Sequence, residues 1–328
     1  MAGDAVRWGG TALAAAPTQT DILNQRPIGI AIAAPGGYAP DPAALDAGIA
    51  RLEQQGYLVH NYYDHAARHQ RFGGTDAARL GQLQAAAADP DVQIVMALRG
   101  SYGMSRLLPA IDYRAMADSG KLFVGYSDFT AFQMALMKET GRISFAGPMV
   151  CDDFTRSDGD DYTMTQFRDC LRGPQHRVHG TVADGDADNP AIAVEGTLWG
   201  GNLAMIVSLL GTPYFPVIDG GILFLEDVGE HPYRIERMLL QLLYAGVLAR
   251  QRAIVLGEFT AYKLGAFDTG YDFAAMLAFI RARLPLPVLA GLPFGHVRRR
   301  ATLPFGGQAS LTSDARSFTL TVRDYPTL

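Results

Sequence analysis

Short unbroken apolar runs alternate with helix-like spacing along the first half of the chain. The runs at 28–33, 92–98 and 122–126 are separated by apolar residues at helical spacing over 42–54 and 75–88. Strands that are apolar on both faces are typical of a parallel sheet covered by helices on each side. We therefore expect a doubly wound α/β domain, with its ligand site at the carboxyl ends of the strands.

The second half of the chain has a different pattern. Apolar runs at 221–225, 253–256 and 288–292 predict further strands, residues 233–244 have helical spacing, and 309–322 alternates in the β manner. Strands of both kinds together with a helix indicate a mixed α/β or β-rich domain. No internal repeat is visible.

Residues 152–189, between the halves, are rich in Asp, Gly and Ser and predict a solvated linker. We therefore expect four parts, namely a mobile tail (1–26), the doubly wound domain (27–152), the linker (153–189) and a smaller β-rich domain (190–328). Within the last of these, Gly200-Gly201-Asn202 predicts a turn that leads into an apolar helix.

The composition argues against several classes of protein. A formal net charge of −5 without a long basic run argues against nucleic acid as a partner. No window approaches the roughly 18 consecutive apolar residues of a membrane span, and the apolar stretch near the N-terminus is too short for a secretory signal. We expect a cytoplasmic protein with Cys151 and Cys170 as unpaired thiols. Because no HExxH, HxH or paired CxxC pattern occurs, we expect no metal and no cofactor.

Ser127 lies between an expected strand and an expected helix, directly after Gly125-Tyr126. A serine on such a sharp turn can project its hydroxyl above the sheet as a nucleophile, with the next amides pointing at the same space. The alternative is an ordinary helix N-cap. The GxSxG pattern is incomplete, because Phe129 stands where its second glycine would be.

A serine nucleophile needs a base and an acid that orients the base. Of the seven histidines, His231 begins a helix, whereas His296 lies in a loop shaped by Gly and Pro. Glu226 follows a buried apolar run and is a candidate acid. Residue chemistry leaves Asp227 and Glu230 open beside Glu226, and His231 open beside His296.

Short landmark segments occur in a fixed order from about residue 28 to beyond 305. They are APGGY (34–38), LRGSYG (98–103), GYSDFTA (125–131), EGTLWGGNL (195–203), LGTP (210–213), LED (225–227) and GH (295–296). In this order and combination they resemble the LD-carboxypeptidase family of serine peptidases, and its muropeptide branch in particular. The resemblance implies a flavodoxin-like N-terminal domain and a β-rich C-terminal domain with the active site between them.

The resemblance also implies roles for individual residues. It assigns a Ser–Glu–His triad to Ser127, Glu226 and His296. It implies oxyanion donors at the backbone of Asp128 and of Gly100-Ser101, and Asn202 is expected to bind substrate. Arg99 and Arg106 are candidates by position to receive the substrate carboxylate, although Arg106, on a helix, could equally be structural. Ser101 stands where the family usually has a second glycine, so a donor there requires Ser101 to adopt dihedrals that glycine reaches easily.

The implied activity is hydrolysis of the L,D-peptide bond between meso-diaminopimelate and the terminal D-Ala of murein tetrapeptides, through an acyl-enzyme. It implies a role in peptidoglycan recycling, no cofactor and a homodimer. Two alternatives are an immunity-type serine peptidase of the same family, which cleaves peptidyl-nucleotide antibiotics, and a muropeptide-binding protein without catalysis.

Overall fold

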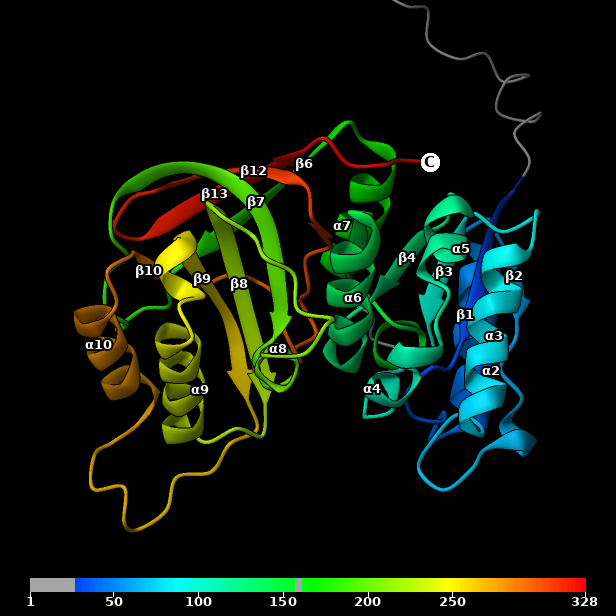
Figure 1. Cartoon of the computed structure of the whole chain (residues 1–328), viewed down its shortest axis with the longest axis horizontal. Helices are drawn as coiled ribbons and strands as arrows, with labels where there is room; N and C mark the ends of the chain where they lie inside the picture. The colour runs from blue at the N-terminus through cyan, green and yellow to red at the C-terminus, as the bar shows by residue number, and fades with distance from the viewer. Residues whose placement is uncertain (1–26, 157–160) are drawn as a thin grey trace, which may run out of the picture.

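The computed structural model describes residues 27–156 and 161–328, which fold around two sheets (Figure 1). The predicted tail, 1–26, lies outside the described residues. The first sheet has six strands in the order β11-β5-β4-β3-β1-β2, of which β11 alone is antiparallel to its neighbour. Its strands are β1 (Ile28–Ala33), β2 (Tyr57–Asn61), β3 (Ile94–Ala97), β4 (Leu122–Gly125), β5 (Ser144–Ala146) and β11 (Leu303–Phe305).

Helices connect the parallel strands of the first sheet, as the alternating pattern predicted. They are α2 (Pro42–Gln54), α3 (Asp76–Ala88), α4 (Met104–Leu107), α5 (Tyr113–Asp118) and α6 (Thr130–Thr140). The start of α2 shows how local chemistry sets a boundary. The Asp41 side chain accepts a hydrogen bond of 3.1 Å from the Ala44 amide, and Pro42 occupies the first turn. The doubly wound α/β fold is confirmed.

The second sheet has seven strands in the order β10-β9-β8-β7-β12-β13-β6. The pairs from β7 to β10 are parallel and those from β7 through β12 and β13 to β6 are antiparallel. This mixed sheet confirms the β-rich second part. Its strands are β6 (Gln175–Thr181), β7 (Ile192–Asn202), β8 (Gly221–Val228), β9 (Gln251–Thr260), β10 (Val288–Ala290), β12 (Gln308–Ser313) and β13 (Ser317–Arg323), and its helices are α8 (Leu203–Ser208), α9 (Pro232–Tyr244) and α10 (Phe273–Arg283).

The predicted linker, 153–189, differs from the structure. It contains helix α7 (Asp161–Arg172) and the edge strand β6, which pairs with β13. Burial of alternate residues in β6, His176, Val178 and Gly180, is the signal of a half-buried strand. The region around this short strand is rich in Asp and Gly, and this composition led to the prediction of a linker. In addition, β11 returns from the second part of the sequence to complete the first sheet.

Gly200 and Gly201 form the end of β7 rather than the predicted turn. Their φ angles are +144° and +132°, and a Cβ on Gly200 would lie 1.8 Å from the Phe224 carbonyl oxygen. Glycine is therefore needed here for close approach of β7 to β8. The expected helix follows directly as α8.

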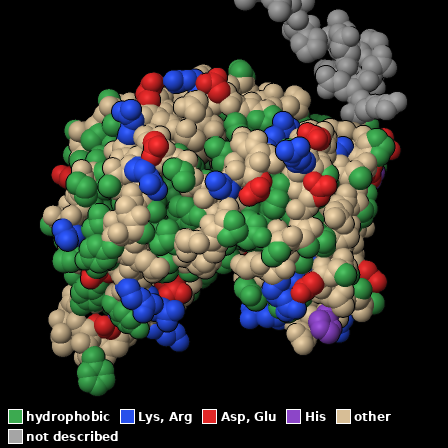
Figure 2. Space-filling view, viewed as in Figure 1, with side chains coloured by type: hydrophobic (Ala, Val, Ile, Leu, Met, Phe, Trp, Pro, Cys, Tyr) green, Lys and Arg blue, Asp and Glu red, His purple; other side chains and the backbone are tan. Residues whose placement is uncertain are grey.

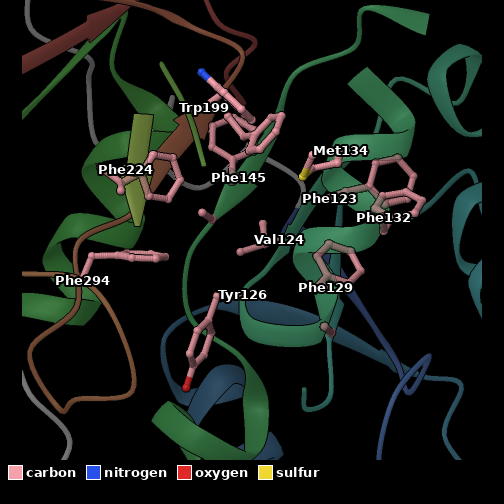
Figure 3. Packing of buried hydrophobic residues seen from close by; sticks show 14 of the residues in the cluster. Phe123, Val124, Tyr126, Phe129, Phe132, Met134, Phe145, Trp199, Phe224 and Phe294 are labelled. Carbon is pink, nitrogen blue, oxygen red and sulfur yellow. The ribbon is translucent and has the colours of Figure 1, made fainter. Parts of the chain in front are cut away.

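Buried aromatic side chains join the two halves (Figure 3). Tyr126, which follows β4, has its ring centroid 6.3 Å from that of Phe294, and Phe294 lies 5.3 Å from Phe224 of β8. Apolar contact across the halves holds the end of β4 against the second sheet. Residues from both halves can therefore contribute to a single site.

Within residues 27–156 and 161–328, no helix is long and apolar enough to cross a membrane. In the same part of the chain, no group of three or more His, Cys, Asp and Glu side chains is arranged to hold a metal ion.

Candidate active site

Ser127 lies on a strained turn between β4 and α6. The strand ends at Gly125, and a 3-10 turn over Ser127–Phe129 leads into the helix. Ser127 has a φ of +60°, in the left-handed region that residues other than glycine rarely occupy. Gly125 allows so tight a turn, because a Cβ there would lie 2.8 Å from the Phe129 ring. Backbone strain of this kind is typical of a nucleophile held at the end of a strand.

The structure brings Ser127, His296 and Glu226 together in one hydrogen-bonded row. His296 Nε2 lies 3.1 Å from Ser127 Oγ, and His296 Nδ1 lies 2.7 Å from Glu226 Oε2. The Tyr126 ring packs edge-on against the imidazole, with 5.0 Å between centroids. A hydroxyl, an imidazole and a carboxylate in this order can transfer the hydroxyl proton and stabilise the resulting imidazolium.

Glu226 reaches His296 from an irregular point of β8. The pairing of β8 with β9 shifts register between Leu225 and Asp227. Consecutive side chains of a regular strand point to opposite faces, but here Glu226 and Asp227 both accept from Asn202 Nδ2, at 3.2 and 2.9 Å. A β-bulge re-aims side chains in this way. It places the fully buried Glu226 carboxylate against the imidazole.

Glu226 also controls the proton affinity of His296. Burial lowers the pKa of His296, but the hydrogen bond to Glu226 and the negative charge of Glu226 outweigh it, so the net pKa is raised. A raised pKa makes the imidazole a stronger proton acceptor. The same shift requires a higher pH for the neutral, basic form.

Asn202 supports the site from behind. Asn202 is buried, its Nδ2 donates to Glu226, and its Oδ1 caps α8 by accepting from the Met205 amide at 3.1 Å. The backbone amide of Asn202 donates to Thr130 Oγ1 of α6 at 3.2 Å. The sequence placed Asn202 among the residues that bind substrate, but in the structure its polar atoms are used within the protein.

The loop after β3 lies against the Ser127 turn. A Cβ on Gly100 would lie 2.8 Å from Ser127 Oγ, so glycine leaves the hydroxyl free. Ser101 has a φ of +73°. Its backbone is therefore in the left-handed conformation that glycine reaches easily and that a donor at this position requires. Asp128 Oδ2 accepts a hydrogen bond of 2.8 Å from the Met104 amide. The loop is thereby tied to the turn that carries Ser127.

Lys and Arg side chains gather on both sides of a hollow between the two halves (Figure 2). Arg99 is half-buried and donates to a backbone carbonyl at 3.3 Å. Arg106 is exposed and pairs with Asp76 at 2.7 Å. Arg71 donates to Ser101 Oγ at 3.1 Å. Arg71 could not be predicted from the sequence, because no local pattern connects a residue after β2 with the loop after β3.

His231, which residue chemistry left open as a base, has structural partners. Its Nδ1 accepts from the Tyr233 amide at 3.3 Å, and its Nε2 lies 3.1 Å from Asp268 Oδ2. It caps α9. The geometry therefore favours His296 as the partner of Ser127.

Comparisons with known proteins agree with this arrangement. Two family models match, the LD-carboxypeptidase N-terminal domain over residues 30–147 and the LD-carboxypeptidase C-terminal domain over 195–311. A putative carboxypeptidase of Streptomyces coelicolor is 35% identical over 89% of this chain and 92% of its own. The murein tetrapeptide carboxypeptidase of Pseudomonas aeruginosa is 31% identical over 81% and 88%.

Solved structures give the same result. The muramoyltetrapeptide carboxypeptidase from Oxalobacter formigenes is 52% identical, with a TM-score of 0.86 over 91% of this chain and 100% of that one. The microcin C7 self-immunity protein MccF shares the fold at 23% identity, with a TM-score of 0.82 over 92% and 97% of the two chains. The chain belongs to the LD-carboxypeptidase family of serine peptidases.

Proposed function

We propose that this protein is a murein tetrapeptide LD-carboxypeptidase, which hydrolyses the L,D-peptide bond between meso-diaminopimelate and the terminal D-Ala. The observation that carries the proposal is the row of Ser127, His296 and Glu226, assembled from both halves of the chain. The similarity to the muramoyltetrapeptide carboxypeptidase from Oxalobacter formigenes supports the substrate class.

In the proposed mechanism Ser127 Oγ attacks the carbonyl carbon of diaminopimelate while His296 Nε2 takes the hydroxyl proton. Glu226, held by Asn202, stabilises the imidazolium and fixes the tautomer. The C–N bond then breaks, and the imidazolium gives its proton to the amine of the leaving D-Ala. Water attacks the acyl-enzyme with His296 again as base, which returns the proton to Ser127 and releases the tripeptide.

The negative oxygen of the tetrahedral intermediate needs donors that are already in place. We assign this role to the backbone amides of Asp128 and of Gly100-Ser101. The left-handed conformation of Ser101 supports this assignment, as does the close approach of Gly100 to Ser127, which leaves no room for a Cβ on Gly100. A substrate that ends in a carboxylate suits a cationic partner. Arg99, in the loop after β3, and Arg71, which donates to Ser101 of that loop, are candidates to receive it.

The main alternative is an immunity-type peptidase that cleaves peptidyl nucleotides. Its support is the shared fold with MccF, at an identity too low to indicate a substrate. A binding protein without catalysis is the second alternative. It does not explain why Ser127, His296 and Glu226 form a hydrogen-bonded row. Incubation of the protein with a glutamyl-nucleotide conjugate distinguishes the first alternative, because the proposal predicts no cleavage of it.

Mass spectrometry of a tetrapeptide and a matched pentapeptide, before and after incubation, tests the proposal. We expect the tetrapeptide to lose one alanine and the pentapeptide to stay intact, and EDTA to leave the rate unchanged because no step uses a metal. Loss of alanine from the pentapeptide alone, or from neither peptide, would contradict the proposed activity.

The same resemblance leads us to propose that the enzyme works in the cytoplasm, in peptidoglycan recycling, as a homodimer with muropeptides rather than nucleic acid as its partners. Light scattering after gel filtration tests the dimer. A mass equal to the 35.4 kDa of one chain would contradict it.

A further inference from the structure

A buried ion pair lies behind His296 and joins the two halves of the protein. Arg300, four residues after His296, is 1% exposed, and Asp153, from the π-helical turn Val150–Phe154, is 6% exposed. Arg300 Nη1 lies 2.6 and 2.5 Å from the two carboxylate oxygens of Asp153. Neither residue belongs to the triad.

The same guanidinium holds the loop that carries His296. Arg300 Nε donates to the Gly295 carbonyl at 2.8 Å, and Arg300 Nη2 donates to the Val297 carbonyl at 3.1 Å. These two residues flank His296 directly in the chain. The backbone on both sides of the imidazole is therefore fixed to one rigid, planar group.

Arg300 also contacts the residue before the nucleophile. Its Nη2 donates to the Tyr126 hydroxyl at 2.8 Å, and its guanidinium carbon lies 3.8 Å from the Tyr126 ring centroid. Tyr126 immediately precedes Ser127, and its hydroxyl donates in turn to Asp152 Oδ2 at 3.1 Å. One cation thus contacts both the turn of the nucleophile and the loop of the base.

We propose that Arg300, anchored by Asp153, is a positioning residue that sets the separation of His296 Nε2 from Ser127 Oγ. This inference rests on the proposed function of the triad. Aromatic packing already holds the halves together, and a buried ion pair is costly to desolvate and adds little stability over apolar packing. The planar guanidinium binds both carbonyls that flank His296 and the Asp153 carboxylate, and it thereby constrains the orientation of the His296 loop. Lysine, with its single point charge, does not reproduce this constraint.

The charge of Arg300 gives a second, independent readout. The charged groups that face His296 are Glu226, Arg300 and Asp152, of which Arg300 lowers the pKa of His296 and the two acids raise it. Loss of the Arg300 charge therefore raises the pKa of His296 further. The acidic limb of the pH profile of kcat/KM then moves to higher pH. A purely structural defect would lower the amount of active enzyme without moving this limb.

The test measures kcat, KM and the pH profile of D-Ala release for Arg300→Met and Arg300→Lys. We expect Arg300→Met to lower kcat about a hundredfold, with little change in KM, and to move the acidic limb upward. Arg300→Lys, which keeps the charge, is expected to lose about tenfold in kcat with the limb unmoved. Activities are normalised to the folded fraction from circular dichroism, and Arg300→Lys keeps the test informative if Arg300→Met fails to fold.

Arg281→Met is the matched control. Arg281 of α10 also binds backbone, donating to the Val288 carbonyl at 2.9 Å and the Asp188 carbonyl at 3.1 Å. It is expected to keep wild-type kcat and the wild-type acidic limb. Folded Arg300 variants with wild-type kcat and an unmoved limb would overturn the inference. Failure of the wild-type enzyme itself to release D-Ala would instead refute the proposed function.

Discussion

The contact between Gly100 and Ser127 gives a sharp prediction for Gly100→Ala. The added Cβ would lie 2.8 Å from Ser127 Oγ and from Ser127 Cβ, whereas ordinary van der Waals contact begins near 3.4 Å. Relief of this overlap requires a shift of about 0.6 Å in the serine or in the loop. Ser127 Oγ lies 3.1 Å from His296 Nε2, so the shift strains the proton transfer, the oxyanion site or both.

A misplacement of about 1 Å in a catalytic constellation costs about a hundredfold in rate. We therefore expect Gly100→Ala to lower kcat/KM for D-Ala release by tenfold to a hundredfold, a barrier increase of about 1.4 to 2.7 kcal/mol. The assay couples released D-Ala to a D-amino acid oxidase under initial-rate conditions. A folded Gly100→Ala enzyme with kcat/KM within threefold of wild type would show that the space between Gly100 and Ser127 does not limit catalysis.

Gly81→Ala is the matched control for this substitution. Gly81 lies within α3, and a Cβ there would meet no atom within 4 Å. Alanine in a helix interior is more stable than glycine by about 0.5–1 kcal/mol. Gly81→Ala should therefore raise the free energy of unfolding and leave kcat/KM unchanged.

Three further predictions follow from the surroundings of the triad. Because Glu226 raises the pKa of His296, kcat/KM should fall as the pH drops through a value above 6.5, and Glu226→Gln should lower the rate and move this limb to lower pH. His231→Ala should cost stability through loss of its Asp268 contact but keep wild-type kcat/KM, and an inactive, folded variant would count against His296 as the base. Burial raises the pKa of Asp128 from 3.8 to about 6. The folded protein therefore holds this proton more tightly than the unfolded chain, and the free energy of unfolding falls as the pH rises between those two values. The free energy of unfolding, measured by urea titration, differs between pH 5 and pH 7.5, and Asp128→Asn should reduce this difference by about 1 kcal/mol. An unchanged difference would contradict the raised pKa of Asp128.

Much of the first half could be predicted because its strands and helices have strong local signals. The strand Ile28–Ala33 and the helix Pro42–Gln54 match their predicted bounds, since an unbroken apolar run and an N-cap followed by proline are local features. Strand β6 could not be predicted in the same way. It is stabilised by pairing with β13, more than a hundred residues later in the chain.

The candidate site shows the same division. Ser127 was indicated by its place between a strand and a helix, whereas the choice of Glu226 and His296 required the order of landmarks along the chain. The contact of Asn202 with Glu226 could not be predicted, because the two residues meet through the register of β7 against β8. Arg300 was not singled out, because its importance comes from contacts with Asp153 and Tyr126 of the other half.

In the proposed mechanism, Ser127 is the nucleophile that releases D-Ala. The most direct measurement is mass spectrometry of murein tetrapeptide incubated with wild-type protein and with folded Ser127→Ala, at equal concentrations confirmed by circular dichroism. We expect the wild-type enzyme to convert tetrapeptide to tripeptide and free D-Ala, and Ser127→Ala to leave it intact. Release of D-Ala by Ser127→Ala at the wild-type rate would exclude Ser127 as the nucleophile.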